Sequence, residues 1–504
     1  MEKYVEYNLD NMEQASVSED LFVNRASYVE MQQQYTAAEV TISIIGLNRL
    51  ERTKRCVESI LQYTKGIDYE LVLIDNGSTD ETLEYFKSVP YEKKRIMRFS
   101  KNLGTGFPGT MTPLGEVGRY VVSLPNDLIV TERWLENLLI CMNSDPKIGL
   151  VVSASSNASN LQGVEFAYSS YEEMQQMAAE YNVSDPTKWE DRLRIITLCT
   201  VIRKEALIAA GSPVGDLGFF HDFSDDDIAF KIRRAGYRTV FAGDTWVCHD
   251  HKVFQGEGKD PVKFQQSLRI GRENFRTKYF GVDAWDDVNN FYRPYLDLLP
   301  APRQTSNARV LGIDVRCGTP ILDVKNWLRK FGIFNTELSA FTQDPKYWVD
   351  LKTICSGAVC CDREEYLAEI FPAGVFDYVV ADRPINRYHE PQKILNDMFE
   401  LAKPGGTIIC KLKNTASFQE YLNMLGQRNV YDQEFSYNIP LEVFINAIGR
   451  HGRLIKITTI PFSFSNEQYE DLRGILPDGY TKEQQDELVS RMVCNEFLII
   501  AEKK

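Results

Sequence analysis

Acidic side chains and a histidine follow apolar runs at several points in the first half of the chain. Asp75 ends the run YELVLI, Asp127 comes shortly after YVVSLP, and His249 follows WVC. Asp226 and Asp227 lie near the start of a segment with helical periodicity. In an open α/β sheet, ligands bind beyond the carboxyl ends of the strands, so these side chains can meet at one rim. Carboxylates and an imidazole there suit a divalent cation and the removal of a proton from a hydroxyl group.

Alternating strands and helices are predicted to position these side chains. The expected strands are residues 40–46, 69–74, 95–99, 120–124, 148–154, 193–203, 238–242 and 246–248. The expected helices are residues 51–63, 80–88, 132–143, 224–236 and 263–282. Such alternation predicts a mostly parallel sheet. Regularity lapses between about residues 155 and 191, where we expect an insertion with a helix around 171–181.

A chain of 504 residues is too long for one hydrophobic core, so several domains are expected. Residues 1–37 are predicted to be an extension, either weakly helical or packed on another part. Residues 38–298 form the first predicted domain, and the polar, Pro-rich residues 299–307 form a linker. A second strand–helix alternation occupies residues 308–504. The predicted fold class is therefore α/β, with two doubly wound Rossmann-like domains.

Composition limits the partners of the chain. A formal net charge of -14 argues against a broad nucleic-acid surface, which needs clustered Lys and Arg. No apolar run approaches the roughly 20 residues of a membrane helix, and the N-terminus has no secretory pattern. Most of the ten cysteines sit in apolar runs, which indicates reduced, buried thiols. We therefore expect a cytoplasmic protein with no membrane span.

Several motifs stand in one order over residues 38–285: TISIIGLNRLERTKRCVESIL, DNGSTDET, NLG, PND and SDDDIAF. On these motifs the segment resembles the inverting family 2 glycosyltransferases of the GT-A fold. The resemblance implies that Gly46, Asn48 and Arg49 contact the base or ribose of a nucleotide. It implies that Asp75 accepts hydrogen bonds from the same part of the donor. The remaining donor-binding residues expected from the resemblance are Asn76, Gly104 and Asn126.

The same resemblance implies a metal site and a catalytic base. Asp127 occupies the last position of the family's D-x-D motif, whose first carboxylate is replaced by Pro125. Asp127 and His249 would hold Mn²⁺ or Mg²⁺, with His251 as the alternative ligand. Other interpretations remain open, because Asn126 or Asp127 can also cap a helix.

The run SDDDIAF resembles the family's E-D-x-D-L segment, and we match its acidic pair to Asp226 and Asp227. Asp227 is then the expected catalytic base, and Ala229 stands at the third acidic position. A structural role is the alternative, because Ser224 and Asp227 have the spacing of a capping box. Three acidic residues also suit the N-terminus of a helix.

The second domain resembles class I S-adenosylmethionine-dependent methyltransferases over residues 307–503. The resemblance depends on VFDYVVADRPINRYHEPQKILNDMFELAKPGGTIICKLKN. The turn after its first strand keeps only Gly318, and its second strand, TELSAF, ends without an acidic residue. We therefore expect a degenerate domain that does not use S-adenosylmethionine. It would instead bind the acceptor, a partner or another copy of the chain, so an oligomer is possible.

The expected function is transfer of a sugar, such as N-acetylhexosamine, from a UDP-type donor to a hydroxyl group. A glycan or a protein such as flagellin is the expected acceptor. One alternative is a bifunctional enzyme that also methylates, and another is a binding scaffold without activity. A nucleotidyltransferase is disfavoured, because it would need a Gly-rich basic loop where residues 46–49 read GLNR.

Overall fold

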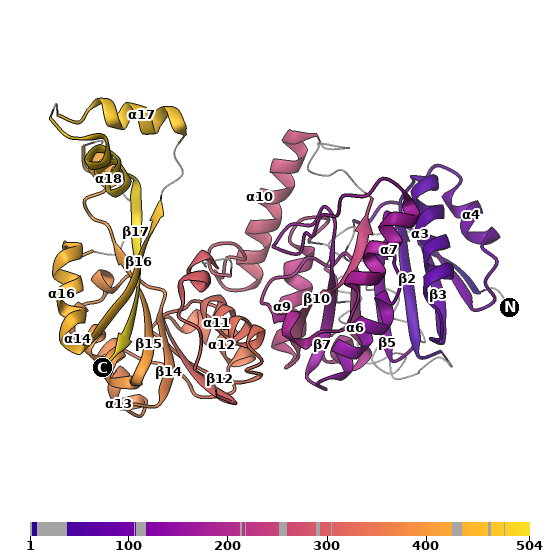
Figure 1. Cartoon of the computed structure of the whole chain (residues 1–504). Helices are drawn as coiled ribbons and strands as arrows, with labels where there is room; N and C mark the ends of the chain where they lie inside the picture. Colours follow the sequence, from indigo (N-terminus) through magenta and orange to yellow (C-terminus); the bar gives the residue numbers. More distant parts are fainter. Residues whose placement is uncertain are drawn as a thin grey trace. The chain divides into compact units, whose positions relative to one another are not determined.

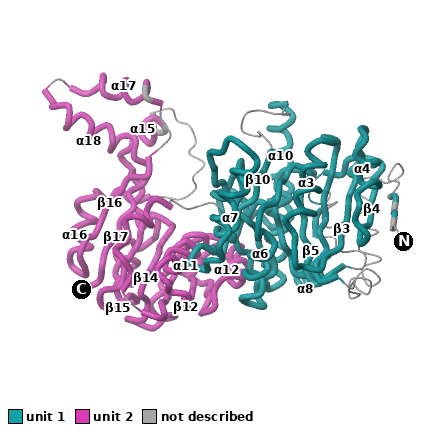
Figure 2. Tube along the Cα trace, turned by 45° about the vertical axis from the view of Figure 1, so that its right-hand side comes forward, with its two compact units in different colours: residues 1–289 teal, residues 290–504 magenta. Residues whose placement is uncertain are grey.

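The chain folds into two compact units, Met1–Asn289 and Asn290–Lys504, coloured separately in Figure 2. The division lies a few residues before the predicted linker, so residues 299–307 belong to the second unit. The computed structural model describes residues 3–7, 38–104, 106, 117–211, 214–216, 218–250, 260–288, 293–303, 305–425, 436–461, 465–477 and 479–504.

The first unit is built on a ten-stranded sheet with the order β1-β4-β3-β2-β5-β9-β7-β10-β6, and β8 pairs with β10. Its strands are β1 (Lys3–Tyr7), β2 (Val40–Gly46), β3 (Tyr69–Asp75), β4 (Lys94–Phe99), β5 (Tyr120–Pro125), β6 (Leu128–Ile129), β7 (Ile148–Ser155), β8 (Trp189–Asp191), β9 (Thr200–Arg203) and β10 (Arg238–His249). The five strands from β1 to β5 are parallel to their neighbours, whereas β9 runs antiparallel between β5 and β7. The expected mostly parallel sheet is confirmed.

Helices flank this sheet, and their bounds are α3 (Leu50–Tyr63), α4 (Thr82–Ser88), α6 (Trp134–Asn143), α7 (Tyr171–Tyr181), α8 (Lys204–Ala210), α9 (Ser224–Arg234) and α10 (Pro261–Lys278) (Figure 1). The helix predicted inside the insertion is confirmed as α7. Three strand predictions were wrong in extent. The strand expected at 193–203 shortens to β9, and the strands expected at 238–242 and 246–248 are one strand, β10, with an irregularity between Ala242 and Trp246.

Both faces of the sheet are buried, which is why its strands read as nearly continuous apolar runs. Alternate residues of β5 illustrate this: Val122 and Leu124 join the core beneath α3 and α6, and Val121 joins the core beneath α9. The strand order reverses between β2 and β5. Such a switch point is where open α/β sheets bind ligands, and Asp127 follows β5 there.

The second unit is also doubly wound, with the order β13-β12-β11-β14-β15-β17-β16 and β17 antiparallel to both its neighbours. Its strands are β11 (Asn307–Ile313), β12 (Asn335–Thr342), β13 (Val359–Cys361), β14 (Phe376–Ala381), β15 (Ala402–Lys413), β16 (Gly452–Pro461) and β17 (Cys494–Lys503). Its helices are α11 (Thr319–Lys330), α12 (Trp348–Ile354), α13 (Leu367–Ile370), α14 (Pro391–Leu401), α15 (Phe418–Leu425), α16 (Leu441–His451), α17 (Asn466–Gly474) and α18 (Lys482–Val493). The predicted fold class, two doubly wound α/β domains, is confirmed.

Two general expectations can be compared with the structure. All ten cysteines are free, and seven of them are buried, as their apolar surroundings indicated. Among the described residues, no helix has both the length and the apolar character that a membrane crossing requires.

Candidate active site

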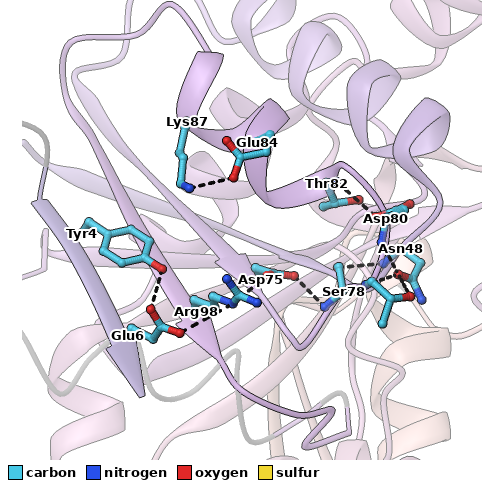
Figure 3. A network of polar contacts seen from close by, with 11 residues as sticks. Tyr4, Glu6, Asn48, Asp75, Ser78, Asp80, Thr82, Glu84, Lys87 and Arg98 are labelled. Atoms are coloured by element: carbon cyan, nitrogen blue, oxygen red, sulfur yellow. Dashed lines mark hydrogen bonds and ion pairs between the residues drawn. The ribbon is translucent and has the colours of Figure 1, made fainter. Parts of the chain in front are cut away.

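The turn after β2 is held to the turn after β3. Asn48 and Arg49 both adopt left-handed backbone conformations, with φ of 56° and 61°. The Asn48 side-chain oxygen accepts hydrogen bonds from the backbone N–H groups of Thr79 and Asp80, at 2.8 and 3.3 Å (Figure 3). The backbone N–H of Asn48 donates to Ser78 Oγ at 2.9 Å. The side chain of Asn48, which was expected to contact the nucleotide, is therefore already used to join these two turns.

Asp75 is the last residue of β3 and is fully buried. Its Oδ1 accepts a hydrogen bond from the backbone N–H of Ser78 at 2.9 Å. Its Oδ2 lies 3.7 Å from Arg98 Nε and has no hydrogen-bond donor among the described residues. A buried carboxylate oxygen without a donor is costly, and an N–H group of a nucleotide base would remove that cost. The role predicted for Asp75, acceptance of hydrogen bonds from a base or ribose, stays a prediction.

Asn76 and Gly104 shape the loop that follows β4. Asn76 Nδ2 donates to the carbonyl of Gly104 at 2.7 Å, and Asn76 Oδ1 accepts from the backbone N–H of Leu103 at 3.0 Å. Gly104 has a φ of +83°, and a Cβ there would lie 1.8 Å from the carbonyl oxygen of Phe220. Only glycine permits this approach, which brings the loop against the segment leading into α9. Gly46, at the end of β2, is closely covered by Phe86.

The side chain of Asn126 forms hydrogen bonds with residues at the start of α3 and just before it. Its Nδ2 donates to the carbonyl of Asn48 at 3.0 Å and to Thr53 Oγ1 at 2.7 Å. Because this amide is buried and bonded within the protein, it positions the turn that bears Arg49. Asn126 thus acts on the turn after β2 rather than as the helix cap that the sequence left open.

Asp127 and His249 come together although 122 positions separate them in the chain. The short strand β6 pairs antiparallel with β10 and sets Leu128 opposite His249. Asp127 Oδ1 then lies 3.6 Å from His249 Nε2, and both side chains are largely buried. Arg49 Nη1 lies 3.6 Å from Asp127 Oδ2. The other ring nitrogen, His249 Nδ1, is 3.4 Å from the carbonyl of Asn157, which leaves Nε2 directed at Asp127.

These two side chains fit the shared binding of a divalent cation. Their facing atoms are closer than twice a metal–ligand bond of about 2.1 Å, so one ion can reach both. Within the described residues, no group of three His, Cys, Asp or Glu side chains is gathered at one point. Among the described residues, an ion held here would thus have Asp127 and His249 as its protein ligands. His251, the alternative ligand, lies outside the described residues.

The three aspartates of α9 have different surroundings. Asp225 is partly exposed, and its Oδ1 accepts hydrogen bonds from the backbone N–H and the hydroxyl of Thr197. Asp226 is buried and accepts from Arg194 Nε at 2.7 Å. Burial raises the pKa of both carboxyls, that of Asp226 to about 6. Asp225 therefore carries a carboxyl with a raised pKa on a residue that is only partly buried.

Asp227 lies on the opposite side of the helix and is fully buried. Its Oδ1 accepts hydrogen bonds from the Tyr279 hydroxyl and from Lys278 Nζ, both at 2.7 Å, and Lys231 Nζ lies 3.3 Å from Oδ2. Lys278 also binds Asp216 at 2.7 Å. This network fastens α10 to α9. The geometry therefore favours a structural role for Asp227, the residue expected to be the base.

Asp225 is the residue that our sequence interpretation passed over. The signal was present, because Asp225 lies in the same SDDDIAF run, and a shift of two residues turns a helical side chain by about 200°. The preceding residue, Ser224, closely faces Gly106 in the loop that follows β4. This contact brings the first residue of α9 against the loop that follows β4.

Replacing Asp226 by asparagine should change how stability depends on pH. Between about pH 4 and 6, the native state holds a proton on Asp226 that the unfolded chain has released, so this group lowers stability as pH rises. The Asp226→Asn variant should therefore gain stability relative to wild type as pH increases from 4 to 7, by about 2 kcal/mol. Unfolding midpoints in urea across this range measure the difference. A difference that does not vary with pH would contradict the buried state of Asp226.

In the second unit, the residues that follow β11 and β12 contact side chains of the same unit. Gly318 has a φ of +106°, and a Cβ there would lie 2.3 Å from Ile354 Cδ1 of α12. Asp314 accepts hydrogen bonds from the backbone N–H and the side-chain amide of Gln343, at 2.8 and 2.9 Å. Gln343 stands directly after β12, where an acidic residue would be needed to hold a ribose. These residues do not fit S-adenosylmethionine.

Comparisons with known proteins find similarity in the first unit. Residues 41–191 match the model of the glycosyl transferase family 2. An uncharacterized protein, y4gI, of Sinorhizobium fredii is 22% identical over 265 residues, which are 49% of this chain and 28% of the relative. The match thus spans little more than a quarter of the length of that relative.

Two solved structures are similar to parts of the chain. A mannosyltransferase from Pyrobaculum calidifontis, in complex with GDP-Man and Mn²⁺, is 16% identical with a TM-score of 0.31, over 51% of this chain and 79% of that protein. A SAM-dependent methyltransferase from Archaeoglobus fulgidus is 17% identical with a TM-score of 0.30, over 46% of this chain and 99% of that protein. The segment of this chain that is similar to glycosyl transferase family 2 therefore runs from β2 to β8 and includes Asp75 and Asp127.

Proposed function

We propose that the first unit is a metal-dependent inverting glycosyltransferase that uses a UDP-sugar, such as UDP-N-acetylhexosamine. The observation that carries this proposal is the pairing of Asp127 with His249 at the switch point of a family 2 domain. The acceptor is a hydroxyl group of a glycan or of a protein such as flagellin. A bound Mn²⁺ or Mg²⁺ would neutralise charge on the diphosphate as it leaves.

The residues of the chain divide the reaction between them. Asp75 accepts a hydrogen bond from the base, and Arg49, beside Asp127, approaches the diphosphate. The acceptor oxygen attacks the anomeric carbon while Asp225 takes its proton. The bond from that carbon to the diphosphate breaks, and its electron pair leaves with the phosphate oxygen. A single displacement of this kind inverts the anomeric centre.

Thermal unfolding with a panel of ligands tests the assignment. We expect UDP with Mn²⁺ to raise the unfolding temperature, because a ligand at 100 times its Kd stabilises by about 2.7 kcal/mol. S-Adenosylmethionine should not change the unfolding temperature. Ile354 covers Gly318, and the side-chain amide of Gln343 already donates a hydrogen bond to Asp314. No response to UDP or GDP would refute the transferase, and a clear shift with S-adenosylmethionine would support the bifunctional alternative.

A further inference from the structure

The first strand of the chain reaches the proposed donor site through one arginine. Strand β1 adds to the edge of the sheet beside β4, which in turn pairs with β3. The register sets Glu6 opposite Arg98, and Arg98 opposite Asp75. Three charged side chains therefore lie in a row across three adjacent strands, at the end of the sheet where Asp75 is buried (Figure 3).

Glu6 and Asp75 share the guanidinium of Arg98. Arg98 Nε lies 3.8 Å from Glu6 Oε1 and 3.7 Å from Asp75 Oδ2, so both carboxylates approach the same nitrogen. Neither separation is short enough for a hydrogen bond. The Tyr4 hydroxyl donates to the other oxygen of Glu6 at 3.0 Å, which orients the carboxylate toward Arg98. Figure 3 shows Tyr4 and Glu6 on β1 on one side of Arg98, with Asp75 on the other.

This sharing leaves the buried Oδ2 of Asp75 without a hydrogen-bond donor among the described residues. A guanidinium that was free to approach Asp75 would form a bidentate pair and supply a donor to Oδ2. Glu6 pulls the same guanidinium in the opposite direction. Arg98 then balances the charge of the buried carboxylate without occupying the oxygen that a base N–H needs.

We propose that Glu6, on the N-terminal strand β1, is a positioning residue for the nucleotide base, acting through Arg98 on Asp75. This inference depends on the proposed donor site and adds to it a role for β1. Uracil and guanine carry a ring N–H that can donate a hydrogen bond to Asp75, whereas cytosine and adenine carry no such group. Loss of the Glu6 carboxylate should therefore weaken binding of the base and leave binding of the diphosphate unchanged.

Calorimetric titration of the full chain with Mn²⁺ and UDP tests the role of Glu6. In the Glu6→Gln variant, we expect the Kd of UDP to rise about 2- to 5-fold, the range of a partly exposed ion pair. Pyrophosphate, which has no base, should bind both proteins equally. In turnover assays, KM for the donor should rise while kcat stays the same, because the base remains bound throughout the reaction.

Two further variants separate positioning from a general structural effect. Asp68→Asn removes a carboxylate from an exposed ion pair with Lys93 at the other end of β3 and β4, and should leave UDP binding unchanged. In an Arg98→Met background, Glu6→Gln should have no further effect, since the residue through which it acts is gone.

The outcomes distinguish this inference from the function on which it depends. Wild-type protein that binds no nucleoside diphosphate would refute both. If wild type binds UDP but Glu6→Gln binds it equally well, only the role of Glu6 is refuted. The same holds if Glu6→Gln weakens pyrophosphate as much as UDP, or still weakens UDP when Arg98 is methionine.

Discussion

Replacing Asp127 by alanine should lower kcat by about 10³-fold while the chain stays folded. Asp127 faces His249 Nε2 at 3.6 Å, and loss of its carboxylate removes one of the two ligands that the described residues offer a divalent ion. The leaving diphosphate would then lose most of the positive charge that stabilises it in the transition state. Initial rates of sugar transfer at increasing Mn²⁺ concentrations measure the effect.

His249→Ala is the companion variant for this prediction. Because both residues would hold the same ion, each change should raise the Mn²⁺ concentration needed for half-maximal rate. The double variant should be little worse than either single one. Near-normal turnover of Asp127→Ala, with unchanged Mn²⁺ dependence, would remove Asp127 from the site. Circular dichroism and the unfolding temperature serve as the control for folding.

Asp225→Asn and Asp227→Asn should separate catalysis from stability. Asp225 is the partly exposed residue of the three and the proposed base, so its loss should reduce kcat by about 10³-fold with little change in unfolding temperature. Asp227 is buried between Lys231, Lys278 and Tyr279. Replacing the Asp227 carboxylate by an amide removes the negative charge between Lys231 and Lys278, so the two ammonium groups repel each other more strongly. That change should cost about 3 kcal/mol of stability and lower the unfolding temperature by about 5–10 °C.

Single-turnover rates and thermal unfolding of both variants measure these two effects. Below its unfolding temperature, Asp227→Asn should keep kcat within about tenfold of wild type, because it only fastens α10 to α9. Asp225→Asn should also lose the decline in rate that wild type shows at low pH, as its carboxyl becomes protonated. A large loss of turnover in a stably folded Asp227→Asn protein would restore Asp227 as the base.

Local patterns in the sequence predicted most of the strands and helices. Apolar runs were sufficient to predict β2, β3, β5 and β7, and helical periodicity was sufficient to predict α3 and α9. Each of these patterns reflects which side chains are buried along one element. Elements without such a pattern were not predicted. Strand β1 is a strand because it pairs with β4. The two residues of β6 form a strand only because they pair with β10.

The sequence also indicated which carboxylates and which histidine to examine, since a polar residue directly after a buried strand lies at the rim of the sheet. It determined that Asp75, Asp127 and His249 occur at such ends. It did not determine that β6 would bring Asp127 to His249, because that pairing joins residues 122 positions apart. Long-range pairing depends on the whole sheet and leaves no local signal.

The assignment of roles among the acidic residues of α9 was decided only by the tertiary structure. Spacing in the chain does not distinguish the three aspartates. In the structure, Asp225 pairs with Thr197, Asp226 with Arg194, and Asp227 with two lysines. A side chain's chemistry depends on its solvent exposure and on its charged neighbours, and both come from elements distant in sequence. For the same reason, the sequence showed Asp75 at a strand end, and only the fold placed Arg98 and Glu6 beside it.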